Sequence, residues 1–205
     1  MTLPAECRLP FLGTRPYLQG TTVFEAVRAH APGAVALDYQ IAHMVFSDRL
    51  RVVDLPSSGL AVRDVNGYLR ATLADGGEVF LGIVALPASP APERIPFDED
   101  EITDPAVFAA GRVDAPWCRR HGIVTNLVSI KKALLQREIA HTRPGKWLFT
   151  RLELSAPLPE AAERLAVRRE KALVGGTMIR SVILADDVPL GHMYFNWKQV
   201  IPPAA

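Results

Sequence analysis

The sequence predicts an α+β protein in which two similar halves each wrap a curved antiparallel sheet around one helix. Three observations lead to this prediction: a break in composition near the middle of the 205-residue chain, matching punctuation on its two sides, and one helical segment in each half. With 49% hydrophobic and 22% charged residues, the composition is ordinary for a globular protein that buries its own core.

The composition break covers residues 86–105. This stretch carries prolines at positions 87, 90, 92, 96 and 105 and an acidic run over 98–101. Prolines remove hydrogen-bond donors from a sheet, and clustered acids repel one another, so we expect an exposed linker. The expected organisation is a first repeat over 1–86, a Pro-rich acidic linker over 87–112, and a second repeat over 113–205.

The two halves show the same order of elements. In the first half, a short apolar segment precedes a helix at 21–30, a strand-rich stretch at 34–54 and paired strands at 67–86. In the second half, a helix at 124–140 is followed by strands at 146–154 and 162–169 and by paired strands at 176–197. This agreement in order predicts an internal repeat.

The best local match between the halves lies in the paired strands. Residues 69–83 and 180–194 each contain Leu-Ala-Asp, a turn and then Leu-Gly, and they align once a two-residue gap is allowed. Asp and Gly in the turn tolerate the unusual backbone angles that hairpins require. We therefore expect a β-hairpin in each half.

The helix at 124–140 has a wide apolar face built on Val124, Leu127, Ile130 and Leu134. The polar residues Lys131, Lys132, Arg137 and Glu138 are expected on the rest of its surface. A sheet wrapped around such a helix keeps a free edge, and a second copy beside it removes that edge. Two copies in one chain imitate a symmetric dimer, and the remaining edges allow a homo-oligomer.

Charge and cysteine content exclude several classes of protein. Lys and Arg number 23 and Asp and Glu 22, and this balance argues against binding to nucleic acid or to an anionic membrane. No apolar run approaches the ~20 residues of a membrane span, and the first residues lack the cationic region of a signal peptide. Two cysteines cannot build a disulfide framework or a Cys-rich zinc site, so we expect a reducing, cytoplasmic compartment.

Residues 19–26, Gln-Gly-Thr-Thr-Val-Phe-Glu-Ala, resemble the start of the central helix in the β-hydroxyacyl-carrier-protein dehydratases, which have the hotdog fold. The resemblance implies a double hotdog, two antiparallel sheets each wrapping a central helix, as a pseudo-dimer in one chain. It also implies that Gly20 opens the helix and that Glu25, five residues later, is the catalytic acid. Ser129 stands at the corresponding place in the second half, so the resemblance assigns the acid to the first half.

In that family a histidine from the opposite hotdog works with the acid, and His121 is the candidate here. The family's loop pattern His-x3-Gly-x4-Pro is absent from both halves, and Ala29 stands where the family has a Gln one turn after the acid. The architectural resemblance covers most of the chain, whereas the motif covers about eight residues. It implies an acyl-CoA or acyl-carrier-protein thioester as substrate.

Each site residue also has an ordinary structural interpretation. Glu25 is either a general acid with a pKa raised by partial burial or the partner of Thr22 in a helix capping box. His121 is either the base that removes an α-proton or a solvent-facing residue of a basic loop. The two interpretations of this pair are separated by whether both groups reach one substrate atom.

The helix starts at Gly20-Thr21 and at Asn126-Leu127 offer free backbone amides that polarise a thioester carbonyl. Asn126 either orients a substrate or caps its helix. His43 is expected on the apolar face of the stretch 35–45, where it either belongs to the core or lines an acyl tunnel. Similar alternatives hold for His192 in the last hairpin.

Basic residues of the second half are candidates for contacts with the phosphates of coenzyme A or of a carrier's phosphopantetheine arm. They are Lys131, Lys132 and Arg168, beside Arg137, Arg169 and Lys171; the alternative is a set of solvated surface cations. No two histidines have ligand spacing on a helix, and no Cys/His cluster is visible, so we expect no metal and no cofactor.

The sequence thus predicts an acyl-thioester enzyme that dehydrates a 3-hydroxyacyl thioester, or hydrates the enoyl form, by acid and base catalysis. A hotdog thioesterase that activates a water is the nearest alternative. A non-catalytic acyl-binding protein is the second, since a fold can lose its chemistry. A structural subunit that pairs through its sheet edges is the third.

Overall fold

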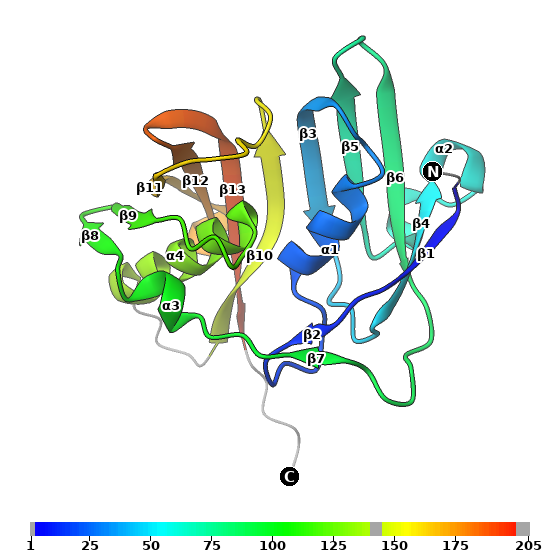
Figure 1. Ribbon diagram of the computed structural model, residues 1–205, viewed down its shortest axis with the longest axis horizontal. Coiled ribbons are helices and arrows are strands. Elements are labelled where there is room, and N and C mark those ends of the chain that lie inside the picture. The colour runs from blue at the N-terminus through cyan, green and yellow to red at the C-terminus, as the bar shows by residue number, and fades with distance from the viewer. Residues whose placement is uncertain (1–2, 140–144, 200–205) are drawn as a thin grey trace. The chain divides into compact units, whose positions relative to one another are not determined.

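The computed structural model describes residues 3–139 and 145–199, and the chain divides into two compact units (Figure 1). The first unit contains Met1–Asp98 and Leu152–Pro157, and the second contains Glu99–Arg151 and Leu158–Ala205. Within the described parts of the chain, no helix is long and apolar enough to cross a membrane.

The first unit is built on an antiparallel sheet with the strand order β1-β4-β6-β5-β3. The strands are β1 (Ala5–Arg8), β3 (Ala34–Ile41), β4 (Arg49–Asp54), β5 (Gly67–Leu73) and β6 (Glu78–Ala85). The helix α1 (Gly20–Arg28) is accompanied by two short segments, α2 (Leu55–Ser58) and the 3-10 turn η1 (Val62–Asp64). A small parallel pair joins β2 (Phe11–Leu12) to β7 (Arg94–Ile95).

Helix α1 is fixed to β3 by its apolar face. Val23, Phe24 and Val27 are fully buried. The Phe24 ring meets the ring of Tyr39 edge-on, with centroids 5.3 Å apart. The Tyr39 hydroxyl donates a 2.8 Å hydrogen bond to the Gly20 carbonyl, so one buried side chain holds both the middle and the start of the helix.

The second unit is built on an antiparallel sheet with the strand order β10-β13-β12-β11-β9-β8. The strands are β8 (Val107–Ala109), β9 (Arg112–Pro116), β10 (Gly145–Leu154, whose last three residues belong to the first unit), β11 (Arg164–Leu173), β12 (Met178–Ala185) and β13 (Val188–Gln199). The helices are α3 (Asp100–Thr103) and α4 (Ile123–Glu138), and the 3-10 turn η2 (Val174–Gly176) joins β11 to β12.

The apolar stripe predicted for the helix at 124–140 is confirmed in α4. Val124, Leu127, Ile130 and Leu134 are each at most 1% exposed, and the helix packs against β9 and β11. The hydrophobic period therefore identified both the helix and the face that it buries.

The two expected hairpins are present as β5–β6 and β12–β13. Asp186 and Asp187 form the second turn with φ of 48° and 64°, which Asp tolerates better than most residues do.

The strand orders of the two units nevertheless differ. We number the sheet strands of each unit 1 to 5 in chain order, from β1 in the first unit and from β9 in the second. The spatial order is then 1-3-5-4-2 in the first unit and 1-3-4-5-2 in the second. The difference arises in the connection that leads into the hairpin of each unit. In the second unit the turn η2 leads β11 directly into its neighbour β12, whereas residues 55–66 of the first unit carry the chain from β4 past β6 to β5.

The stretch expected to be a linker contains β7, α3 and β8. It is anchored in the first unit by Asp48, whose fully buried carboxylate accepts hydrogen bonds from the Ser89 amide (2.7 Å) and from Arg8 Nε (3.2 Å). Burial acts to raise the pKa of Asp48, but these hydrogen bonds outweigh it, and the pKa is lowered.

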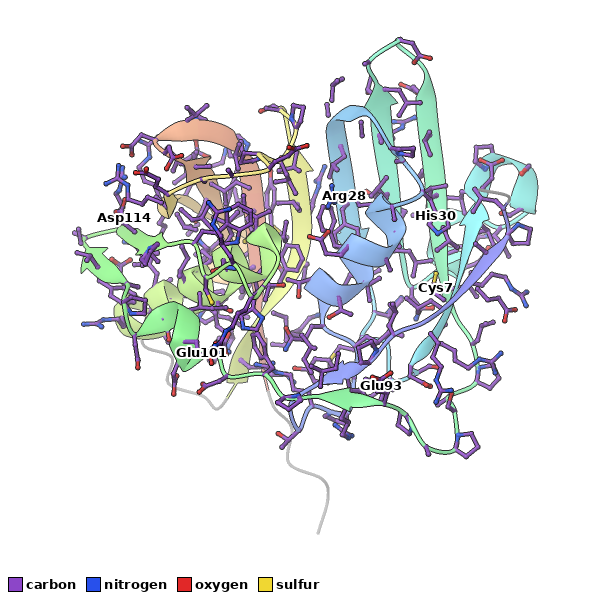
Figure 2. All side chains as sticks on the ribbon, in the orientation of Figure 1. Cys7, Arg28, His30, Glu93, Glu101 and Asp114 are labelled. Atoms are coloured by element: carbon purple, nitrogen blue, oxygen red, sulfur yellow. The ribbon has the colours of Figure 1, made fainter. Side chains whose placement is uncertain are left out.

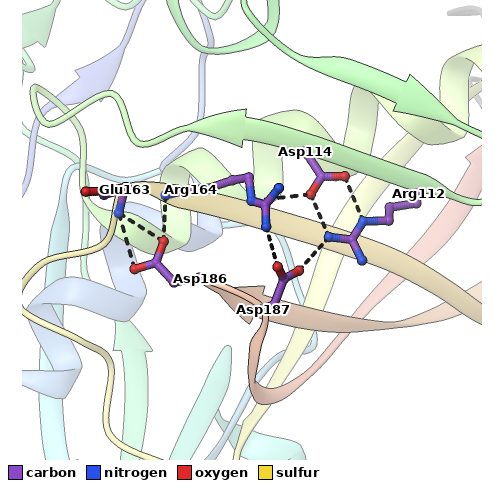
Figure 3. Close-up of polar contacts among 6 residues, drawn as sticks. All are labelled: Arg112, Asp114, Glu163, Arg164, Asp186 and Asp187. Carbon is purple, nitrogen blue, oxygen red and sulfur yellow. Dashed lines mark hydrogen bonds and ion pairs between the residues drawn. The ribbon is translucent and has the colours of Figure 1, made fainter.

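An ion-pair network ties β9 and β11 to the last hairpin (Figure 3). Arg112 binds Asp114 at 2.6 Å and Asp187 at 2.8 Å, and Arg164 also pairs with Asp187. Asp186 accepts a 2.9 Å hydrogen bond from the Arg164 amide. The hydrogen bond from Arg112 lowers the pKa of Asp187.

Candidate functional site

The start of α1 has backbone amides that no helical carbonyl and no capping side chain satisfies. Its N-cap is Gln19, whose side chain makes no capping hydrogen bond, and the first helical bond of the backbone runs from Val23 N to Gln19 O at 3.1 Å. The amides of Gly20, Thr21 and Thr22 therefore precede the first helical bond and have no intrahelical acceptor. The alternative in which Thr22 and Glu25 form a capping box is wrong, because the helix begins too early for it.

The Thr21 side chain adds a second polar feature to this helix start. Thr21 is 1% exposed, and its hydroxyl has no hydrogen-bond partner among the residues that the structure describes. Buried hydroxyls are normally paired, so this unpaired one is a candidate contact for a ligand or a water. Glu25 follows Thr21 by four residues and so lies on the same side of the helix, one turn further on.

Glu25 is less buried than the sequence led us to expect. Its side chain is 34% exposed and pairs with Arg28, whose Nε and Nη2 donate to Oε2 at 3.2 and 2.9 Å (Arg28 is labelled in Figure 2). The guanidinium fixes the direction of the carboxylate while the group stays accessible.

His121 lies in the turn between β9 and α4, just before Gly122, the N-cap of that helix. Its side chain is 20% exposed, and Nε2 lies 3.9 Å from Oε2 of Glu101. The alternative of a solvent-facing histidine is therefore wrong. The residue is largely buried beside a carboxylate.

Asn126 is not the N-cap of α4, which is Gly122. It lies in the second turn of α4, three residues after the helix begins at Ile123, and is 1% exposed. Its Oδ1 accepts from the Cys118 amide at 3.0 Å, and its Nδ2 donates to the carbonyls of Cys118 and His121 at 3.1 Å. The Asn126 side chain thus stabilises the turn that precedes α4.

The expectation that no Cys/His cluster exists is also wrong. The Cys118 Sγ, one ring nitrogen of His121 and one carboxylate oxygen of Glu101 all lie within 4.8 Å of one another. Glu101 comes from α3 and is labelled in Figure 2. Cys118 and His121 stand three residues apart in the sequence, but the third donor, Glu101, lies 17 residues before Cys118, and only the tertiary fold brings it to them.

Lys131 cannot contact a carrier's phosphate from the place where it lies. It is 0% exposed, and its Nζ donates a hydrogen bond to Oγ of Ser181, which is also 0% exposed. Burial, and then the charge of Arg169, lower the pKa of Lys131 from 10.5 to about 7, while Glu138 acts in the opposite direction. The expected position on the polar side of α4 is thus corrected.

The other candidates keep surface positions. Lys132 is partly exposed and pairs with Glu99, and Arg168 is exposed on β11. His43 lies beyond the end of β3 and is exposed, so its expected place on the apolar face is wrong. His192 has Nε2 2.7 Å from Nη2 of Arg180 on the neighbouring strand.

The first unit therefore brings together Gly20, Thr21 and Glu25 on one helix. The second unit brings His121 and Asn126 into one turn before and within α4, with Cys118 and Glu101 beside them.

Comparison with known proteins gives similarity in structure alone. No family model and no curated protein matches the sequence. A bifunctional dehydratase-cyclase domain of ambruticin biosynthesis is 19% identical, with a TM-score of 0.49, over 90% of this chain and 82% of that one. The dehydratase domain of RzxB from Pseudomonas fluorescens is 11% identical, with a TM-score of 0.47, over 88% and 86%.

A putative oleoyl thioesterase from Lactobacillus plantarum is 10% identical, with a TM-score of 0.41, over 96% of both chains. These three structures are a dehydratase-cyclase domain, a dehydratase domain and a putative thioesterase, and each has a TM-score below 0.5 to this chain.

Proposed function

We propose that this chain is an acyl-thioester enzyme, most simply a dehydratase or hydratase of 3-hydroxyacyl thioesters. The observation that carries the proposal is the start of α1. Backbone amides without intrahelical acceptors, the unpaired buried hydroxyl of Thr21 and the accessible carboxylate of Glu25 follow one another along one side of this helix.

The amides and the positive end of the helix dipole suit a thioester carbonyl, whose oxygen gains negative charge when an α-proton is removed. For the proposed reaction, His121 is the candidate base for the α-proton, and Glu25, in its protonated form, is the candidate acid that gives a proton to the departing 3-hydroxyl. The Cα–H and Cβ–O bonds break, the Cα=Cβ bond forms, and water leaves. Hydration is the reverse.

The proposed architecture is a double hotdog, with repeats over 1–86 and 113–205 joined by 87–112. In each unit one helix accompanies an antiparallel sheet, which supports this proposal. The two strands of the hairpin take opposite places in the two sheets: counted from β1, β6 precedes β5 in the first unit, and counted from β9, β12 precedes β13 in the second. Arg168 and Lys132 remain the proposed contacts for the phosphates of coenzyme A or a carrier arm.

A thioesterase is the second candidate, because the helix start and Glu25 lie in one unit and are enough to polarise a carbonyl and activate a water. A panel of 3-hydroxyacyl, enoyl and saturated acyl thioesters of increasing length, followed by mass, separates the two. Interconversion of hydroxyacyl and enoyl forms, lost in Glu25→Ala and in His121→Ala, supports the dehydratase.

Release of free thiol that is lost in Glu25→Ala but kept in His121→Ala supports the thioesterase. Binding of the thioesters without turnover would overturn both and indicate an acyl-binding protein. The variant Glu78→Gln is the control. It removes an exposed carboxylate at the first residue of β6 and should leave turnover unchanged.

A further inference from the structure

The turn before α4 presents three side chains whose chemistry suits a metal ion rather than a purely structural contact. A thiol sulfur, an imidazole nitrogen and a carboxylate oxygen, from Cys118, His121 and Glu101, lie within 4.8 Å of one another. Cys118 and His121 are partly buried and Glu101 is exposed, so an ion can enter from solvent.

Hydrogen bonds to the backbone hold the turn that carries Cys118 and His121. The His121 amide donates to the Cys118 carbonyl at 3.1 Å, which closes the turn. The buried amide of Asn126 bonds to the backbone of both residues, and Trp117 Nε1 donates to the His121 carbonyl at 3.1 Å. A turn fixed at so many points keeps the sulfur and the imidazole on the same side before any ligand arrives.

The third donor is oriented by a separate contact. Arg120 Nη1 donates to Oε1 of Glu101 at 3.0 Å. This leaves the second oxygen, Oε2, directed toward the imidazole, 3.9 Å from Nε2 of His121. Hydrogen bonds of this kind to a ligating carboxylate are the usual outer support of metal sites.

The donor set selects the metal. Zn²⁺ takes Cys sulfur at about 2.3 Å, His nitrogen at about 2.0 Å and carboxylate oxygen at about 2.1 Å, whereas Mg²⁺ and Ca²⁺ prefer oxygen alone. Donors around one tetrahedral ion lie roughly 3.5 Å apart, as these bond lengths require. The observed separations, which are within 4.8 Å, have to shorten by rotation of the three side chains when an ion binds.

We propose that Cys118, His121 and Glu101 form a zinc site with three protein ligands and a fourth position left for water. The thiolate and the carboxylate together balance the charge of the ion. The site goes beyond the proposed dehydratase reaction. It also competes with that reaction, because a zinc-bound imidazole nitrogen can no longer accept a proton.

The test is a zinc titration of the purified, chelator-treated chain against a chromophoric chelator, at equal concentrations of protein and ion. We expect one Zn²⁺ per chain. Cys118→Ser and His121→Ala should each weaken binding by about 100-fold or more, and Glu101→Gln by about 10-fold. Replacement of zinc by Co²⁺ should give a thiolate-to-cobalt charge-transfer band that Cys118→Ser removes.

The matched control is Cys7→Ser, which removes the other cysteine, on β1 of the first unit, and should bind zinc as the wild type does. Arg120→Gln tests the orienting contact without touching a ligand, and about a 10-fold loss is expected. Circular dichroism of each variant checks its fold. Because Glu101→Gln and Arg120→Gln alter exposed side chains, a loss in these two variants cannot be assigned to unfolding.

Wild-type protein that leaves all zinc on the chelator, or variants that bind as the wild type does, would overturn the site. The result is independent of the proposed reaction, since binding is measured without a substrate. If the protein is a dehydratase as well, excess zinc should suppress turnover and a chelator should restore it.

Discussion

The buried amino group of Lys131 gives the sharpest prediction about stability. Its pKa is about 7 in the folded chain, against 10.5 for a lysine in the unfolded chain, because burial disfavours the charged form. Between these two values the unfolded chain holds a proton that the folded chain has released. The free energy of unfolding therefore rises with pH from about 7 upward and is independent of this group below that value.

The magnitude follows from the two pKa values. Their difference of about 3.5, at about 1.4 kcal/mol per unit, corresponds to about 5 kcal/mol over the whole window. Between pH 7 and about pH 9 the gain is about 2 kcal/mol, because the folded group is half protonated at the start. Lys131→Met should remove this gain, although Ser181 then loses its donor at a cost of about 1–3 kcal/mol.

The assay is urea unfolding at both pH values, followed by tryptophan fluorescence. All 3 tryptophans, at positions 117, 147 and 197, belong to the second unit, so the signal reports on the unit that contains Lys131. The control is Lys132→Met, which removes a partly exposed neighbour paired with Glu99 and should keep the rise. An equal rise in wild type and Lys131→Met would refute the reasoning.

Two further variants test contacts within single units. Asp187→Asn should lower the melting temperature at pH 7, because the pKa of Asp187 is lowered by its hydrogen bond to Arg112; the stabilisation is lost as pH falls through that pKa. The two melting temperatures should converge only once the pH falls below the lowered pKa of Asp187, and a difference that stays constant with pH would contradict this. Tyr39→Phe should destabilise by about 1 kcal/mol in urea unfolding, because the Gly20 carbonyl loses a buried donor; an unchanged midpoint would contradict it.

Local pattern was enough to predict the secondary structure around the site. The apolar stripe of α4 and the Asp-containing turn of the last hairpin are both short-range features, and both are present. The exchange of the hairpin strands in the first unit was not predictable in this way. It depends on how residues 55–66 carry the chain from β4 to β5, and no hydrophobic period records that path.

Lys131 shows a signal that the sequence did contain. It follows Leu127 by four residues and precedes Leu134 by three, so it lies on the buried stripe of the helix. Because a lysine is charged, we expected it on the polar surface of the helix instead. The length of the side chain and the hydroxyl of Ser181 allow a lysine at this place, and the partner comes from a strand 50 residues away.

The candidate sites were predictable only in part. Glu25 and the helix start at Gly20 come from one contiguous motif, and the structure places them on one helix. The cluster of Cys118 and His121 needed Glu101, which α3 brings in from upstream, and it needed Asn126 to fold the turn. Contacts between distant segments of this kind depend on packing, which a single sequence does not display.

The central claim is that the helix start and Glu25 process an acyl thioester. The most direct measurement is the rate of water loss from a 3-hydroxyacyl thioester by chelator-treated wild type, Glu25→Gln and the control Glu78→Gln. We predict that Glu25→Gln lowers kcat by about 100-fold or more with little change in KM, while the control matches the wild type. Equal kcat values for wild type and Glu25→Gln would contradict the claim.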